Sequence, residues 1–223
     1  NIIHDLALLS LPVVLCLDRG GLVGEDGPTH HGAFDMAALR PIPHLTICSP
    51  MDEHELRRMM YTAQLPGMGT VVIRYPRGAA EHNDWRRKLE AIEGGTGRRM
   101  HEGHDVAVLT IGPIGNVAAE AVAEVEAEGQ LTVAHYDMRY LKPIDGGILD
   151  EVGQRFSRVI TVEDGVRCGG LGTAVTEWMA DHHYTPEIVR LGLPDEFVEH
   201  GTVSELRRIA GIDKATIIQH IKG

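Results

Sequence analysis

The sequence predicts an α/β fold of two domains, each with a mainly parallel sheet flanked by helices. Short apolar runs alternate with segments of helical character, about 10–15 residues long, which is typical of parallel βαβ units. A stretch rich in charge and glycine interrupts this alternation at 79–104. The 223 residues suffice for one large domain or two modest ones. We therefore expect a domain at 1–84, a linker at 85–104 and a second domain at 105–223.

The first domain should contain three buried strands, because three short runs of apolar and β-branched residues are bounded by polar or turn-forming residues. These runs lie at 12–17, 45–48 and 70–74. A helix should begin near Ser49-Pro50, with Asp52 in its first turn, and end near Gln64. Residues 18–44 contain five glycines and three prolines and are expected to form a loop.

The second domain should continue the same alternation. Apolar runs that predict strands lie at 105–111, 131–136, 158–163 and about 187–191. Helical patterns lie at 117–128, from 145 to about 156, and at about 171–182. Three helix starts carry typical N-cap residues, namely Asp145, Thr202 (with Glu205 in a capping box) and Asp213.

The beginning of the chain indicates a longer polypeptide. The first ten residues, NIIHDLALLS, resemble the end of a helix already under way, with Ile2, Ile3, Leu6 and Leu9 on an apolar face. The chain also begins with Asn1 and not with Met. We expect a fragment, the alternative being an artefact that removed only a few residues.

The composition argues against several classes of partner. Acidic residues number 32 against 21 basic ones, a net charge of −11, so no nucleic-acid partner is expected. Aromatic residues make up only 4%, which disfavours a stacking surface for RNA or a carbohydrate cleft. No apolar run reaches membrane-spanning length and no signal peptide precedes the first strand, so no membrane partner is expected.

The three cysteines, Cys16, Cys48 and Cys168, are too few and too widely spaced for a disulfide framework or a zinc site. Cys16 and Cys48 lie in apolar runs and are expected to be buried free thiols, which suits a reducing cytoplasm. His30 and His31 are not expected to bind a metal, because adjacent side chains point apart and no third ligand has suitable spacing.

The densest group of polar residues follows the first strand, in DRGGLVGEDGPTHHGAFD at 18–35. Ligands of open α/β sheets bind at the carboxyl ends of strands, so we interpret this segment as an active-site loop. It would present an imidazole with a carboxylate to orient it. The alternative is a solvated surface loop without such a role.

A second cluster, RYPRG at 74–78, ends the third predicted strand. Arg74 and Arg77 could clamp an anionic group, because a guanidinium binds phosphate or carboxylate oxygens in pairs. The alternative is a surface pair that balances the negative charge of the chain. Glycine clusters at 112–115 and 165–172 do not fit a nucleotide-binding motif.

These motifs, in their order, resemble the 1-deoxy-D-xylulose-5-phosphate synthase family over essentially the whole chain. The resemblance is carried by the loop at 18–35, by SPMDEHELRRMMYTA and VVIRYPRG, and by YDMRYLKPID, TVEDGVRCGGLGTAV and LGLPDEFVEHGTVSEL. Transketolase has a GEDGPTH-like segment, but the continuation HGAFD and the ending RYPRG resemble the synthases. A further alternative is a non-catalytic module similar to the β chain of 2-oxo-acid dehydrogenases, which shares this domain pair.

The resemblance implies the end of a thiamine-diphosphate-enzyme pyrimidine-binding domain, followed by a transketolase C-terminal-like domain. Such transferases condense pyruvate with D-glyceraldehyde 3-phosphate to 1-deoxy-D-xylulose 5-phosphate and CO2, the first step of non-mevalonate isoprenoid biosynthesis, also linked to thiamine biosynthesis. They are cytoplasmic homodimers that use thiamine diphosphate and Mg2+. The cofactor and metal motifs (GDG…N and a glutamate) are expected upstream of Asn1, so the isolated chain should be inactive.

The resemblance also assigns roles to single residues. His30 corresponds to the histidine beside the reacting carbon, where an imidazole can shuttle protons. Asp26 corresponds to an acid that contacts the substrate or orients the loop. Arg19, Arg74 and Arg77 correspond to residues that hold the sugar phosphate, with the alternative that one of Arg74 and Arg77 only pairs with a carboxylate. Family members often have Gln where this chain has His31, to which no role is attached.

Overall fold

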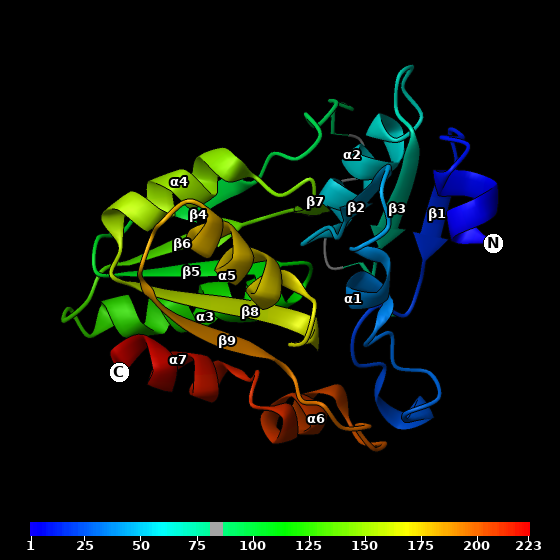
Figure 1. The fold of residues 1–223 in the computed structure, drawn as a ribbon. Coiled ribbons are helices and arrows are strands. Elements are labelled where there is room, and N and C mark those ends of the chain that lie inside the picture. The colour runs from blue at the N-terminus through cyan, green and yellow to red at the C-terminus, as the bar shows by residue number, and fades with distance from the viewer. Residues whose placement is uncertain (81–86) are drawn as a thin grey trace.

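The computed structural model describes residues 1–80 and 87–223 and contains two sheets with helices packed on them (Figure 1). This confirms the predicted α/β class. One sheet is built mainly from the first half of the chain, and the other from the second half. The predicted boundary between residues 84 and 85 lies outside the described residues.

The first sheet has the strand order β1-β3-β2-β7. Strands β1 (Val14–Leu17), β2 (Leu45–Cys48) and β3 (Thr70–Arg74) are parallel and confirm the three predicted strands. The fourth strand, β7 (Tyr140–Lys142), comes from the second half of the chain and pairs antiparallel with β2. It was not predicted, because three residues are too few to show a strand periodicity.

Among residues 1–80, the helical segments are η1 (Ile2–Ala7), η2 (Gly24–Asp26), α1 (Asp35–Leu39) and α2 (Glu53–Thr62). Helix α2 is the predicted helix, but it begins later than Ser49-Pro50. Its N-cap is Asp52, whose carboxylate accepts a hydrogen bond from the Glu55 backbone at 2.8 Å. Segments η2 and α1 lie in the stretch predicted as loop, because each is too short for a helical repeat.

The second sheet has the order β4-β6-β5-β8-β9. Its strands are β4 (Arg98–His101), β5 (Val106–Ile111), β6 (Val133–Asp137), β8 (Arg158–Val166) and β9 (Glu187–Leu193). All neighbours are parallel except β4, which pairs antiparallel with β6. The stretch predicted as a linker therefore supplies an edge strand to this sheet.

The helices of the second half are α3 (Ile114–Ala127), α4 (Gly146–Arg155), α5 (Leu171–Asp181), α6 (Val203–Ala210) and α7 (Lys214–Lys222). The predicted N-caps Asp145, Thr202 and Asp213 are confirmed, and Thr202 forms the predicted capping box with Glu205. Helix α3 begins three residues before its predicted start at 117, on Ile114 after Pro113.

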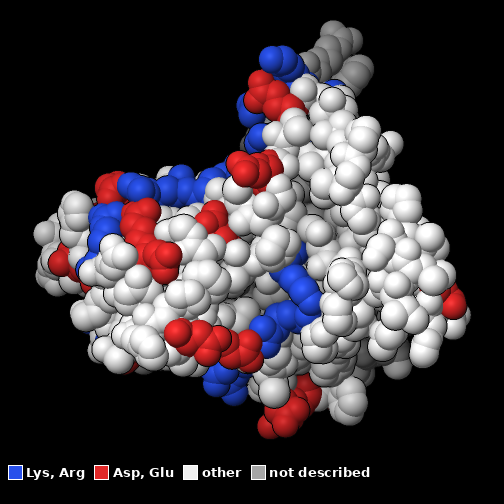
Figure 2. Space-filling model, turned by 45° about the horizontal axis from the view of Figure 1, so that its top comes forward, with Lys and Arg blue, Asp and Glu red and all other residues white. Residues whose placement is uncertain are grey.

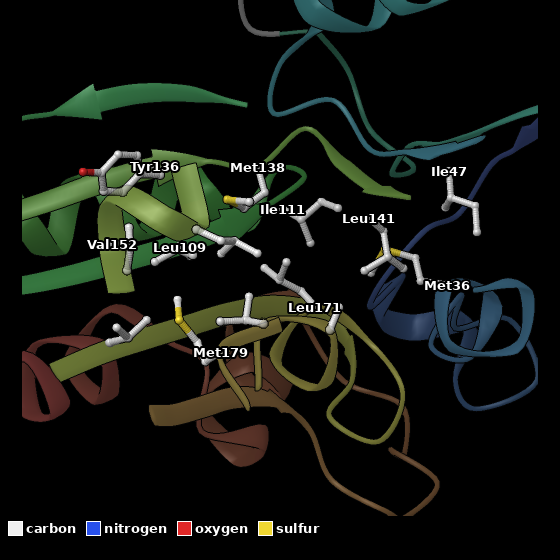
Figure 3. Packing of buried hydrophobic residues seen from close by; sticks show 14 of the residues in the cluster. Met36, Ile47, Leu109, Ile111, Tyr136, Met138, Leu141, Val152, Leu171 and Met179 are labelled. Atoms are coloured by element: carbon white, nitrogen blue, oxygen red, sulfur yellow. The ribbon is translucent and has the colours of Figure 1, made fainter. Parts of the chain in front are cut away.

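Side chains of β5 alternate between two apolar clusters on the two faces of the second sheet. Val106 and Val108 pack with residues of α3 and α7, whereas Leu109 and Ile111 pack with residues of α4 and α5. The cluster that contains Leu109 and Ile111 continues to the first sheet, where it includes Leu141 of β7, Ile47 of β2 and Met36 of the adjoining helix α1 (Figure 3). This cluster is therefore common to the two sheets.

The surface differs from the prediction at one cysteine. Cys48 is buried as expected, and burial raises the pKa of its thiol to about 12. Cys16 is exposed on the edge strand β1, where its Sγ lies 3.8 Å from Met60 Sδ. On the face drawn in Figure 2, acidic and basic side chains lie in mixed clusters. Within 1–80 and 87–223, no helix is long and apolar enough to cross a membrane.

Candidate functional site

The loop after β1 (residues 18–34, the β1 loop) and the RYPRG segment leave the same edge of the first sheet. Strands β1 and β3 are parallel neighbours, with Leu17 opposite Arg74. Their pairing continues past the strands, since Tyr75 N donates to Leu17 O at 3.0 Å and Gly20 N donates to Tyr75 O at 2.8 Å. Two clusters that are distant in sequence are thereby brought to one place, as parallel strands require.

Asp26 is the point where two arginines of these segments meet. Its Oδ2 accepts from Arg19 Nη1 at 3.3 Å and from Arg77 Nη1, which lies 51 residues further along the chain. The side chains of Arg19, Asp26 and Arg77 are 40%, 34% and 56% exposed, so water weakens each ion pair. Two guanidinium groups on one carboxylate leave a local positive charge that suits an anionic ligand.

Arg74 lies apart from this exposed cluster and pairs with a carboxylate, the alternative that was open for one of the two arginines of RYPRG. Its side chain is buried, and its Nε donates to both carboxylate oxygens of Asp35 at 3.0 Å. Its Nη2 donates to the backbone carbonyls of Gly32, at 2.9 Å, and of Asp164. Arg74 therefore links the β1 loop to the end of β8 and is not exposed to a ligand.

The two adjacent histidines have different surroundings. His30 is exposed, and its Nδ1 lies 2.9 Å from Thr29 Oγ1. His31 is half-buried and uses both ring nitrogens: Nδ1 lies 3.1 Å from the Val23 backbone nitrogen, and Nε2 lies 3.2 Å from the Glu199 carbonyl oxygen. Of the two, His30 is the imidazole that is more accessible to solvent.

Residues of the second half of the chain also hold the β1 loop. Asp164 Oδ1 accepts from the Leu22 backbone at 3.1 Å, and the Glu199 carbonyl faces His31. Sequence reasoning missed Asp164 and Glu199, which lie 142 and 168 residues from their partners. No local pattern could have indicated either contact, because both depend on how the two sheets face each other.

The second sheet has a comparable loop after β8 (residues 167–170, the β8 loop). Glu163, near the end of β8, accepts from the backbone N–H groups of Leu171 and Gly172 at the start of α5, each at 2.9 Å. Burial raises the pKa of the Glu163 carboxyl to about 7, although these two hydrogen bonds and nearby arginines act in the opposite sense. The carboxylate occupies the position at a helix start where a bound anion would lie.

The described residues do not fit a magnesium–diphosphate site. Within 1–80 and 87–223, no group of three or more His, Cys, Asp and Glu side chains could hold a metal ion. Asp26 offers one carboxylate, which two arginines already share, whereas Mg2+ requires several oxygen ligands. We therefore assign no residue of this chain to a metal or to a cofactor diphosphate and derive no step through either.

The fold is that of a transketolase-type protein. Residues 95–217 match the family described as transketolase, C-terminal domain, and residues 1–82 match the transketolase pyrimidine binding domain. The chain belongs to the transketolase C-terminal domain family.

The relatives found by sequence similarity have a more specific description than the domain family. The chain is 59% identical over 221 residues to the 1-deoxy-D-xylulose-5-phosphate synthase of Bacteroides thetaiotaomicron and 58% identical over 221 residues to that of Bacteroides fragilis. Each match covers 99% of this chain and 34% of the relative, so the chain spans about a third of the length of these curated relatives.

A solved structure shares the fold. It is described as a split gene transketolase, inactive beta4 tetramer, and superimposes with a TM-score of 0.83 at 28% identity. The match covers 99% of this chain and 69% of that one. The two-sheet arrangement is therefore found in a protein of considerably different sequence.

Proposed function

We propose that this chain is the C-terminal part of a 1-deoxy-D-xylulose-5-phosphate synthase, which condenses pyruvate with D-glyceraldehyde 3-phosphate and releases CO2. The identity of 59% to a synthase over nearly the whole chain supports this proposal. The observation that carries the role of the chain itself is the convergence of Arg19 and Arg77 on Asp26, on the loop that also holds His30.

In this proposal, Arg19 and Arg77 bind the phosphate group of the aldehyde substrate. Their planar guanidinium groups match phosphate oxygens in pairs. Asp26, which holds both groups on one side of the loop in the free protein, also contacts the substrate or orients the loop. His30 accepts and returns a proton at a substrate oxygen, because its ring is exposed and an imidazole exchanges protons near neutral pH.

Thiamine diphosphate and Mg2+ belong to the same proposal, with their ligands in a part of the protein that precedes Asn1. We also propose that the full-length protein is a homodimer and is located in the cytoplasm. The 223-residue chain alone should neither bind the cofactor with micromolar affinity nor turn over the two substrates, and calorimetry with thiamine diphosphate and Mg2+ tests this directly.

Steady-state kinetics on the full-length protein tests the phosphate site. Arg19→Ala and Arg77→Ala should each raise the KM for D-glyceraldehyde 3-phosphate about 10- to 150-fold, the usual effect of a lost charge-assisted contact. The KM for pyruvate should be unchanged, and the effect should be much smaller with an unphosphorylated aldehyde. Arg208→Ala, an exposed arginine on α6, is the matched control. Equal losses with both aldehydes would contradict phosphate binding.

The fold match to a split gene transketolase favours transketolase as a second candidate. The two candidates differ in the donor, since the synthase decarboxylates pyruvate and a transketolase takes its two-carbon unit from a ketose. Release of CO2 from pyruvate by the full-length protein, dependent on the aldehyde, supports the synthase. Transfer of a two-carbon unit from a ketose without CO2 release would instead support the transketolase function.

A further inference from the structure

We propose that His31 is a positioning residue that links the β1 loop to the second half of the chain and thereby fixes where Asp26 and His30 lie. Its effect on turnover rests on the proposed function. The link itself does not, and it can be measured separately.

The hydrogen bonds of His31 determine its tautomer. A backbone N–H can only donate, so Nδ1 must accept from Val23, at 3.1 Å, and carries no proton. The neutral ring then has its proton on Nε2, which lies 3.2 Å from the carbonyl oxygen of Glu199, a group that can only accept. The imidazole therefore joins two backbone groups, using one acceptor and one donor.

The position of these bonds explains why they would matter for the site. Val23 precedes η2 and His31 follows it, so the hydrogen bond between them closes the base of the segment that carries Asp26 and His30. The bond from His31 to Glu199 then attaches this base to the loop before α6. A change at His31 would alter the site without removing a group that touches the substrate.

The loop before α6 packs tightly against the same segment. A Cβ atom at Gly24 would lie 3.2 Å from the Gly201 carbonyl oxygen, and one at Gly27 would lie 3.4 Å from the Cβ of His200. Both glycines have positive φ values, 81° and 76°. The backbone of the β1 loop is therefore in close contact with the second half on both sides of Asp26.

A second contact supports the same attachment. Asp164 accepts from the Leu22 backbone at 3.1 Å through Oδ1, and its Oδ2 lies 3.6 Å from Arg207 Nη2. A Cβ at Gly21 would lie only 2.5 Å from the Asp164 carboxyl carbon, so the loop could not approach closer. Two consecutive backbone N–H groups, of Leu22 and Val23, are thus held by Asp164 and His31.

Two variants of His31 distinguish the effect of its hydrogen bonds from the effect of its side-chain volume. His31→Gln keeps one acceptor for Val23 and one donor for Glu199 in a planar amide. His31→Leu has a similar size but leaves both backbone groups without their partner. If His31 only fills space, the two variants should behave alike.

Kinetics of the full-length protein provides the first readout. His31→Leu should lower kcat by roughly 10-fold or more, because misplacement of a catalytic group by about 1 Å can reduce the rate 10²-fold. His31→Gln should stay within about twofold of the unchanged protein, since its hydrogen bonds are retained. Similar losses in both variants, or no loss in either, would overturn the positioning role.

Amide hydrogen exchange without substrate provides the second readout, and it does not depend on the reaction. The Val23 amide should exchange faster in full-length His31→Leu protein, and His31→Gln should restore its protection. If the unchanged protein has no synthase activity, the proposed function fails while this test still decides the link. Unchanged exchange at Val23 in His31→Leu overturns the link even where the synthase reaction is confirmed.

Discussion

The loops after β1 and β8 occupy equivalent places, each at the carboxyl end of a parallel strand, yet they use their charges in opposite ways. The β1 loop leaves Arg19 and Asp26 partly exposed. Near the β8 loop, the buried Glu163 accepts two N–H groups of its own helix α5. The comparison teaches that the two loops differ in the burial of the carboxylate: Glu163 is buried at a helix start and leaves no room for an outside anion, whereas Asp26 and its arginines remain accessible to solvent.

The largest expected effect concerns Arg74, which connects the β1 loop to β8. Arg74→Met keeps most of the volume but leaves Asp35 and two backbone carbonyls without their donor. Removing one partner of a buried ion pair should lower the free energy of unfolding by about 3–5 kcal/mol. Chemical denaturation checks this, with the exposed Arg77→Met as the control that should change stability little. Similar stability of the two variants would mean that Arg74 is not a structural residue.

His30 tests the other side of the comparison, because its exposed ring should matter for the reaction and not for the fold. His30→Ala should lower turnover of the full-length protein about 10²-fold or more, the usual range for a lost acid–base group. The temperature of unfolding should stay the same. His104→Ala, another exposed histidine, is the control. Loss of folding together with activity in His30→Ala would place His30 among the structural residues.

A substitution at Gly170 tests whether the Glu163 carboxylate can move from its position at the start of α5. A Cβ atom at Gly170 would lie 1.9 Å from Glu163 Oε2, and the carboxylate cannot move away without losing the N–H groups of Leu171 and Gly172. Gly170→Ala should therefore lower the free energy of unfolding by about 2 kcal/mol. At Gly69 an added Cβ meets open space, so Gly69→Ala is the control. Equal effects of both variants would show that the carboxylate can move.

The smallest effect, taken per pH unit, is a dependence of stability on pH. The pKa of Glu163 is raised by burial to about 7 in the folded protein, above the 4.5 of an unperturbed glutamate. The folded state therefore binds more protons than the unfolded state between these values, and stability falls as pH rises through this range. The slope should reach at most about 1.4 kcal/mol per pH unit and vanish above about pH 7.

Denaturation of the unchanged protein and of Glu163→Gln from pH 5 to 8 measures this contribution. The variant lacks the titration, so the difference in stability between the two proteins isolates Glu163. Relative to Glu163→Gln, the unchanged protein should lose free energy of unfolding as the pH rises to about 7, and the difference should then stay constant. A difference that grows in favour of the unchanged protein would mean that the N–H groups of α5 outweigh burial.

The strands of the first sheet could be predicted because each is a bounded apolar run, and the helix N-caps Asp145, Thr202 and Asp213 because capping depends on residues three positions apart. The convergence of Arg19 and Arg77 could also be anticipated, since parallel strands end at one edge. Which of Arg74 and Arg77 lies apart from the exposed cluster could not. It depends on the burial of a strand end by Asp35 and by Asp164, which is 90 residues away.

The surroundings of the paired histidines show the same limit. Nothing in the dipeptide distinguishes His30 from His31, because the difference arises from Glu199, a residue 168 positions further along the chain. Cys16 was predicted to be buried from its apolar neighbours, but the face of β1 on which it lies depends on what packs there. Local sequence patterns thus determine the helices and strands, whereas the surroundings of the candidate site residues depend on how the two sheets pack against each other.

The short strand β7 has a consequence for anyone who cuts this chain into parts. Ile47 and Cys48 of β2 pair with Lys142 and Tyr140 of β7, so the second half supplies the outer strand of the first sheet. A separately expressed segment of residues 1–80 would present β2 as an unpaired edge, and such edges readily recruit strands from other molecules. A soluble truncation would have to carry residues 140–142 along, for instance on a linker after residue 80 that returns β7 to the edge of β2.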